Sequence, residues 1–87
     1  MHTVDLLTQA IQLAQHLGYT VRQEWLFGSA GGGCTLKGRR LLFLDLTLGA
    51  ADQLDLVIST LRRENFPPDM VIPPALRAIL ERSETTV

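Results

Sequence analysis

Residues 28–40, GSAGGGCTLKGRR, hold five of the chain's seven glycines, its only cysteine and a cluster of basic side chains. Residues of these types fit three chemistries: a glycine-rich cradle for phosphate, a reactive thiol in a mobile loop, and a basic patch for nucleic acid. A flexible hairpin connection without chemistry of its own is the alternative to all three. Spacing and context decide among them.

The glycine spacing does not match a phosphate-binding loop. A P-loop needs Gly, four residues and then Gly-Lys-Ser/Thr at the start of a helix, because backbone N–H groups and the lysine hold the phosphates. Gly28 and Gly33 have this separation, but Cys34 occupies the lysine position and a strand is predicted next. The dinucleotide pattern G-x-G-x-x-G begins at Gly31 and Gly33 and fails at Leu36. We therefore expect no cofactor.

Cys34 lacks the partners of a catalytic or metal-binding cysteine. A reactive thiol needs a base or cation that lowers its pKa, and zinc needs several Cys or His ligands at short spacings. His2 and His16 are the only histidines, and no motif places either beside Cys34. Strand alternation predicts that Cys34 and Leu36 point inward, where cysteine acts as a small hydrophobe. We predict no catalytic residue and no metal site.

Lys37, Arg39 and Arg40 form a basic cluster at the turn predicted around Gly38. These side chains could contact phosphate, but no aromatic residues alternate with them and no nucleic-acid-binding motif surrounds them. The net charge of the chain is −1, so no overall field attracts nucleic acid or an acidic membrane. We expect the basic turn to be solvated.

The composition predicts one globular domain over residues 1–87, with a frayed tail at 83–87. Hydrophobic residues make up 46% of the chain and charged residues 20%, which separates it from disordered proteins. A single cysteine forms no internal disulfide and fits a reducing compartment. No apolar run is long enough to span a bilayer, and MHTVDLL does not resemble a signal peptide. We expect a cytoplasmic protein without a membrane partner.

Helical periodicity predicts three helices. The first begins near Thr3, which can cap it, and ends at Gly18. The second begins near Leu48 or Gly49, with Thr47 as a candidate cap, and stops before the prolines at 67–68. The third follows Pro73 and Pro74.

Alternating patterns predict three strands between the first two helices. They lie over residues 19–25, over a short segment that includes Cys34 and Leu36, and over residues 40–46, with a tight turn at Gly38 between the last two. We expect an α+β fold of order α-β-β-β-α-α, in which a three-stranded antiparallel meander carries helices mainly on one face. Leu44 and Leu54 are the expected centre of the core.

The third strand, RLLFLDL, is apolar on both faces. Leu42, Leu44 and Leu46 can face the helices. Leu41 and Phe43 then point to the opposite face, where the neighbouring strands place polar side chains. Large exposed apolar patches mark interaction sites, so Leu41 and Phe43 are the candidate interface. The alternative is that the C-terminal segment covers them within one chain.

The run GGGCTLKGRRLLFLDL, preceded by GYTVRQEW and followed by a helix containing Gln-Leu, resembles a group of small uncharacterised bacterial proteins. The likeness covers the middle half of the chain. It implies a bacterial, cytosolic origin and supplies no catalytic residue.

These observations favour a non-enzymatic protein-interaction module that associates with itself as a homodimer or with another protein. The first alternative is a small enzyme or ligand-binding protein that uses Cys34 and a flexible loop containing Gly28, Gly31, Gly32 and Gly33. The second is a nucleic-acid-binding accessory protein that uses the turn at Lys37, Arg39 and Arg40.

Overall fold

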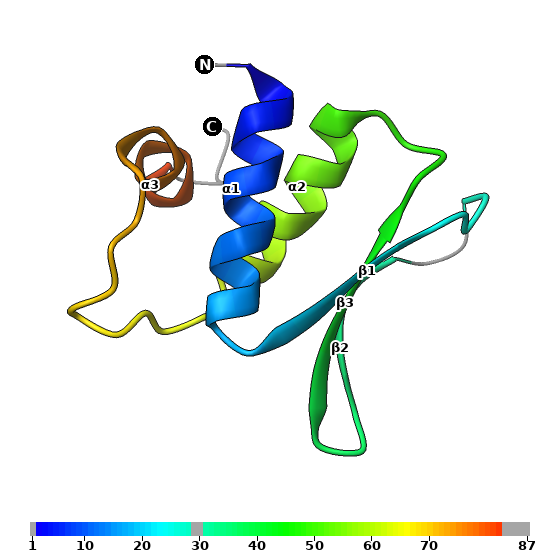
Figure 1. The fold of residues 1–87 in the computed structure, drawn as a ribbon, viewed down its shortest axis with the longest axis horizontal. Helices are drawn as coiled ribbons and strands as arrows, with labels where there is room; N and C mark the ends of the chain where they lie inside the picture. Colours follow the sequence, from blue (N-terminus) through cyan, green and yellow to red (C-terminus); the bar gives the residue numbers. More distant parts are fainter. Residues whose placement is uncertain (1, 29–30, 83–87) are drawn as a thin grey trace.

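The computed structural model describes residues 2–28 and 31–82, so the predicted fraying of residues 83–87 lies outside the described residues. The elements follow one another as α1 (Thr3–His16), β1 (Tyr19–Glu24), β2 (Gly32–Leu36), β3 (Arg39–Asp45), α2 (Ala50–Leu61) and α3 (Pro74–Glu81) (Figure 1). The predicted α+β class is confirmed.

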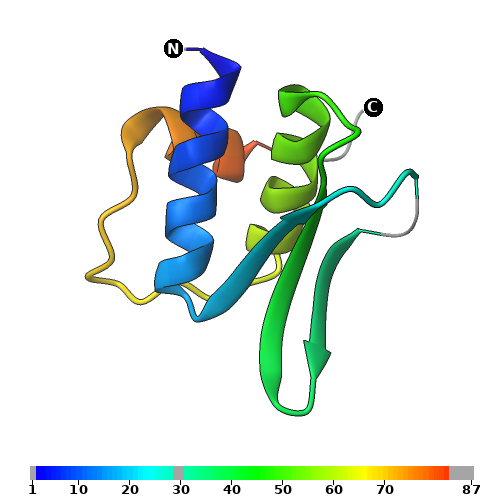
Figure 2. The same cartoon turned by 45° about the vertical axis from the view of Figure 1, so that its right-hand side comes forward.

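The sheet is mixed, so the predicted antiparallel meander is wrong. β3 is the central strand: β1 pairs with it in parallel and β2 pairs with it antiparallel, which gives the spatial order β1-β3-β2. The physical reason lies in residues 25–28 after β1, which lead the chain across the end of β3 instead of turning it back beside β1 (Figure 2). Only the hairpin between β2 and β3 has the predicted antiparallel form.

All three helices lie on one side of the sheet (Figure 2). α1 and α2 pack side by side; α1 contacts β1, and α2 contacts β2 and β3. α3 contacts α1 and α2 but no strand of the described chain. The sheet therefore has one face covered by helices, called the inner face below, and an opposite face that no helix covers.

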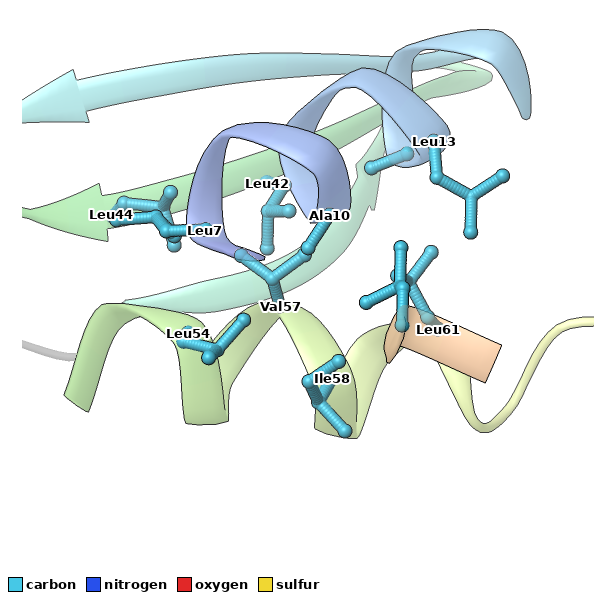
Figure 3. Packing of buried hydrophobic residues seen from close by; sticks show 11 residues of the cluster. Leu7, Ala10, Leu13, Leu42, Leu44, Leu54, Val57, Ile58 and Leu61 are labelled. Atoms are coloured by element: carbon cyan, nitrogen blue, oxygen red, sulfur yellow. The ribbon is translucent and has the colours of Figure 1, made fainter. Parts of the chain in front are cut away.

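The core lies between the inner face and the helices (Figure 3). Leu44 and Leu54, the predicted centre of the core, are both buried, which confirms that expectation. Burial of such side chains stabilises the fold by about 1.5–3 kcal/mol each. The buried apolar residues are Leu7, Ala10, Leu13, Ala14, Leu42, Leu44, Leu54, Val57, Ile58, Leu61 and Leu76.

The helix ends correct two predicted caps. His2, not Thr3, occupies the N-cap position of α1, and Gly49, not Thr47, occupies that of α2. The Thr47 hydroxyl instead donates a hydrogen bond to Asp45 Oδ1 at 2.7 Å. Gly18 follows α1 with φ of 99°, a left-handed conformation that glycine adopts without strain, and the chain turns there into β1.

Candidate functional site

The sheet face opposite the helices is uncovered in the described part of the chain, and we call it the open face. Leu41 and Phe43 lie on it and are half-buried, whereas Leu42 and Leu44 on the inner face are fully buried. The chain through α3 runs on the other side of the sheet, so it does not cover Leu41 and Phe43 (Figure 2). The open face forms a shallow depression of about 530 Å³, lined by Thr20, Arg22, Leu36, Lys37, Arg39, Leu41 and Phe43.

The register of β2 corrects the predicted orientation of Cys34 and Leu36. Cys34 pairs with Leu41 and Leu36 pairs with Arg39, so both side chains lie on the open face and not in the core. Cys34 is exposed, and 58% of the Leu36 surface is accessible. Gly33 occupies the inward position instead. The open face therefore carries more apolar surface than the sequence indicated.

Gly31 and Gly33 allow the chain to approach its neighbours closely. A Cβ on Gly33 would lie 3.0 Å from Thr60 Cγ2 of α2, and one on Gly31 would lie 3.0 Å from the backbone oxygen of Phe43. Contacts of 3.0 Å are tighter than nearly all real Cβ contacts, so a larger residue at either position would displace Thr60 or the backbone of Phe43 by a few tenths of an ångström. The glycine-rich stretch thus has a packing role.

Asp45 fixes the connection that crosses the end of β3. Its carboxylate accepts hydrogen bonds from the N–H groups of Leu26 (3.1 Å), Gly28 (2.9 Å) and Thr47 (2.9 Å), and from the Thr47 hydroxyl. Burial alone would raise the pKa of Asp45, but the hydrogen bonds from Gly28, Thr47 and Leu26 outweigh it and hold the pKa well below its usual range. Asp45 is thus a structural carboxylate.

The same connection presents two aromatic side chains to solvent. β1 ends at Glu24, so Trp25, the last residue of the predicted strand, lies outside it and is 64% exposed, and Phe27 is 79% exposed. Their ring centroids lie 6.4 Å apart. Phe27 has φ of 51°, which is strained for a bulky residue, and the hydrogen bonds of Asp45 to both neighbours of Phe27 hold it there.

The three basic residues of the hairpin do not form one patch. Lys37 and Arg39 lie on the rim of the open face. Arg40 points to the inner side, where it donates to Leu17 O at 3.0 Å and forms an ion pair with Glu64.

Tyr19 completes this cluster around Arg40. The Arg40 guanidinium lies 4.4 Å from the Tyr19 ring centroid and donates to its hydroxyl, and that hydroxyl donates to Glu64 Oε2 at 2.8 Å. Burial and the bond to Glu64 raise the pKa of Tyr19, while the bond from Arg40 lowers the pKa of Glu64. The cluster ties β1 and β3 to the end of α2. A nucleic acid at the turn would therefore find two cations, not three.

Neither histidine lies beside Cys34 to act as its base. His2 and His16 belong to α1 and its N-cap, across the sheet from Cys34, and His16 Nδ1 lies 2.8 Å from Gln12 O. Within residues 2–28 and 31–82, no three His, Cys, Asp or Glu side chains are arranged to hold a metal ion.

Sequence reasoning missed three features of the site: the open-face position of Cys34 and Leu36, the hydrogen bonds from Leu26 and Gly28 to Asp45, and the exposed aromatic pair. A signal existed for Asp45, because it ends an otherwise apolar strand and follows a glycine-rich connection.

Comparison of the chain with protein-family models, with curated proteins and with solved structures finds no match. The resemblance of the middle segment to small bacterial proteins therefore stays a prediction. None of the helices among the described residues has the length and apolar character required to cross a bilayer.

Proposed function

We propose that this chain is a self-associating interaction module that buries its open face against the open face of a second copy. The observation that carries the proposal is the presence of Leu36, Leu41 and Phe43 on a sheet face that the described chain leaves uncovered. Water contact with such side chains is unfavourable, and exposed apolar patches of this kind are typical of interaction sites.

The open face carries Arg22, Lys37 and Arg39 on its lining, and Glu24 is ion-paired with Arg22 within the chain. Arg39 begins β3, while Glu24 lies beside the last residue of that strand. Two sheets stacked about 10 Å apart, with the two-fold axis across the strands, bring Arg39 of one copy near Glu24 of the other and Leu41 onto Phe43. A two-fold axis along the strands would instead place Arg39 of one copy against Arg39 of the other. The axis across the strands is therefore favoured.

The dimensions of the face set the expected affinity. Three strands at about 4.8 Å and seven residues at about 3.3 Å give a surface of roughly 14 by 23 Å. This is about 320 Å² per copy, which is below the area of stable specific complexes, so association through this face alone is weak. We therefore expect a dimer that dissociates on dilution.

Sedimentation velocity across a concentration series tests this proposal. The unmodified protein should shift from monomer to dimer as concentration rises. A variant with Leu41→Lys and Phe43→Thr should stay folded and associate more weakly, because the paired face then carries a charge and loses its aromatic ring. The matched control, Val4→Thr with Val71→Lys, changes two side chains that are 61% and 88% exposed and lie off the open face, and it should associate normally. A monomer at every concentration, or association of the Leu41 and Phe43 variant as strong as that of the unmodified protein, would contradict the proposal.

A further inference from the structure

The two edges of the sheet differ in their protection against strand addition. β1 carries Arg22 and Glu24, which form an ion pair at 2.8 Å. Charged side chains and prolines on an edge strand are the usual obstacles to pairing with another strand. β2, GGCTL, has neither, and no described strand pairs with its outer side. β2 is thus the unprotected edge.

The hairpin turn determines which backbone groups of β2 are unpaired. Lys37 and Gly38 have φ of 51° and 78°, as in a type I′ turn, which is closed by a hydrogen bond between its first and fourth residues. Leu36 and Arg39 are therefore a hydrogen-bonded pair. Such pairs alternate along an antiparallel ladder, so Cys34 also bonds to β3.

Gly33 and Thr35 occupy the alternate positions of β2. Their N–H and C=O groups consequently point away from β3, toward the free edge. Gly33 adds no side chain to block approach.

We propose that β2 pairs antiparallel with β2 of a second copy, joining two sheets into one of six strands. Cys34 is the middle residue of β2, so a two-fold axis there pairs Gly33 with Thr35 of the other copy on both sides. The four unpaired groups on each strand then find partners. Cys34 faces Cys34 of the second copy in a non-hydrogen-bonded position, where Cα atoms lie about 4.5 Å apart. This contact is independent of the open face and goes beyond the proposed function.

Cross-linking of Cys34 with dibromobimane, a reagent that bridges two nearby thiols, tests the pairing. The unmodified protein should give a cross-linked dimer. Thr35→Pro removes an edge N–H while leaving the bonds between β2 and β3, so it should lose the cross-link. Thr35→Val retains that N–H and should keep it.

The Leu41→Lys and Phe43→Thr variant separates the two proposals, since it should lose open-face association and retain the Cys34 cross-link. A cross-link that persists in Thr35→Pro but disappears in this variant would overturn the edge pairing and leave the open-face dimer standing. Absence of the cross-link in the unmodified protein would also overturn it.

Hydrogen exchange provides a measurement that needs no variant. The amides of Gly33 and Thr35 should exchange quickly in dilute protein and slow down as concentration rises, while the Cys34 amide is protected throughout. Equal, concentration-independent exchange at Gly33 and Thr35 would contradict the pairing even if Thr35→Pro failed to fold.

Discussion

The two faces of β3 carry similar side chains in opposite surroundings. Leu42 and Leu44 are fully buried between the sheet and the helices, whereas Leu41 and Phe43, one position away along the strand, line a shallow open depression. Side chains alternate between the faces of a strand, so one short segment serves both. The inner face contributes to the stability of the fold, whereas the open face is available for contacts of the folded chain.

The largest expected difference between the faces is in the cost of removing a leucine. Leu44→Ala leaves a cavity beneath the helices and should lower the free energy of unfolding by about 2–5 kcal/mol. Leu41→Ala removes the same atoms from the same strand on the open face, and should cost about 1 kcal/mol or less in dilute, monomeric protein. Urea denaturation of both variants measures the difference, and equal losses would mean that the open face is covered within the chain.

Asp45 lies on the open-face side of β3 but is buried, unlike Leu41 and Phe43. Its substitution should give the second largest loss of stability. Asp45 alternates with Leu41 and Phe43, yet it is 2% exposed because the crossing connection folds over it. Asp45→Asn removes the charge that four donors share, so it should lower the melting temperature clearly, though less than Leu44→Ala does.

The pH dependence of stability tests the same carboxylate. The pKa of Asp45 is lowered in the folded chain, so the unfolded chain binds the proton first as pH falls. The stabilisation is present well above the unfolded value of about 3.9 and declines as pH drops through it. Urea denaturation between pH 3 and about pH 7 should show a shallower acid loss in Asp45→Asn. Glu64→Gln is the comparison variant. The pKa of Glu64 is also lowered, so this carboxylate accounts for a separate part of the acid loss of stability. Parallel curves for Asp45→Asn and the unmodified protein would contradict this assignment.

Local patterns along the chain predicted the helices, the turn at Gly38 and the burial of Leu44 and Leu54. They also predicted that Leu41 and Phe43 point away from the helices. Each follows from periodicity or turn chemistry within a short window, where the identity of neighbouring strands does not matter. The role of Leu41 and Phe43 as an interface stays a prediction.

Strand order and the register of β2 could not be read in the same way. A seven-residue connection after Glu24 is compatible with a hairpin beside β1 or with a path across the end of β3. Contacts of Asp45 and Gly31 with residues distant in sequence favour the path across β3. In β2, hydrophobicity favoured Cys34 and Leu36 as inward residues. The close approach of Thr60 favours Gly33 there, and a shift of one residue reverses every side chain of a strand. The apolar character of both faces of β3 was the available signal that it is the central strand.

Cys34 gives the smallest expected effect on stability and the sharpest check of the β2 register. Its side chain is exposed on the open face, so Cys34→Ser should change the free energy of unfolding by no more than about 0.5 kcal/mol. In dilute native protein the thiol should react with a maleimide nearly as fast as in unfolded protein. The rate should fall as concentration rises, because association through the open face or the β2 edge covers it. If instead the thiol reacts slowly at every dilution and reacts fast only in denaturant, Cys34 lies on the inner face. The β2 register on which both proposed contacts depend is then wrong.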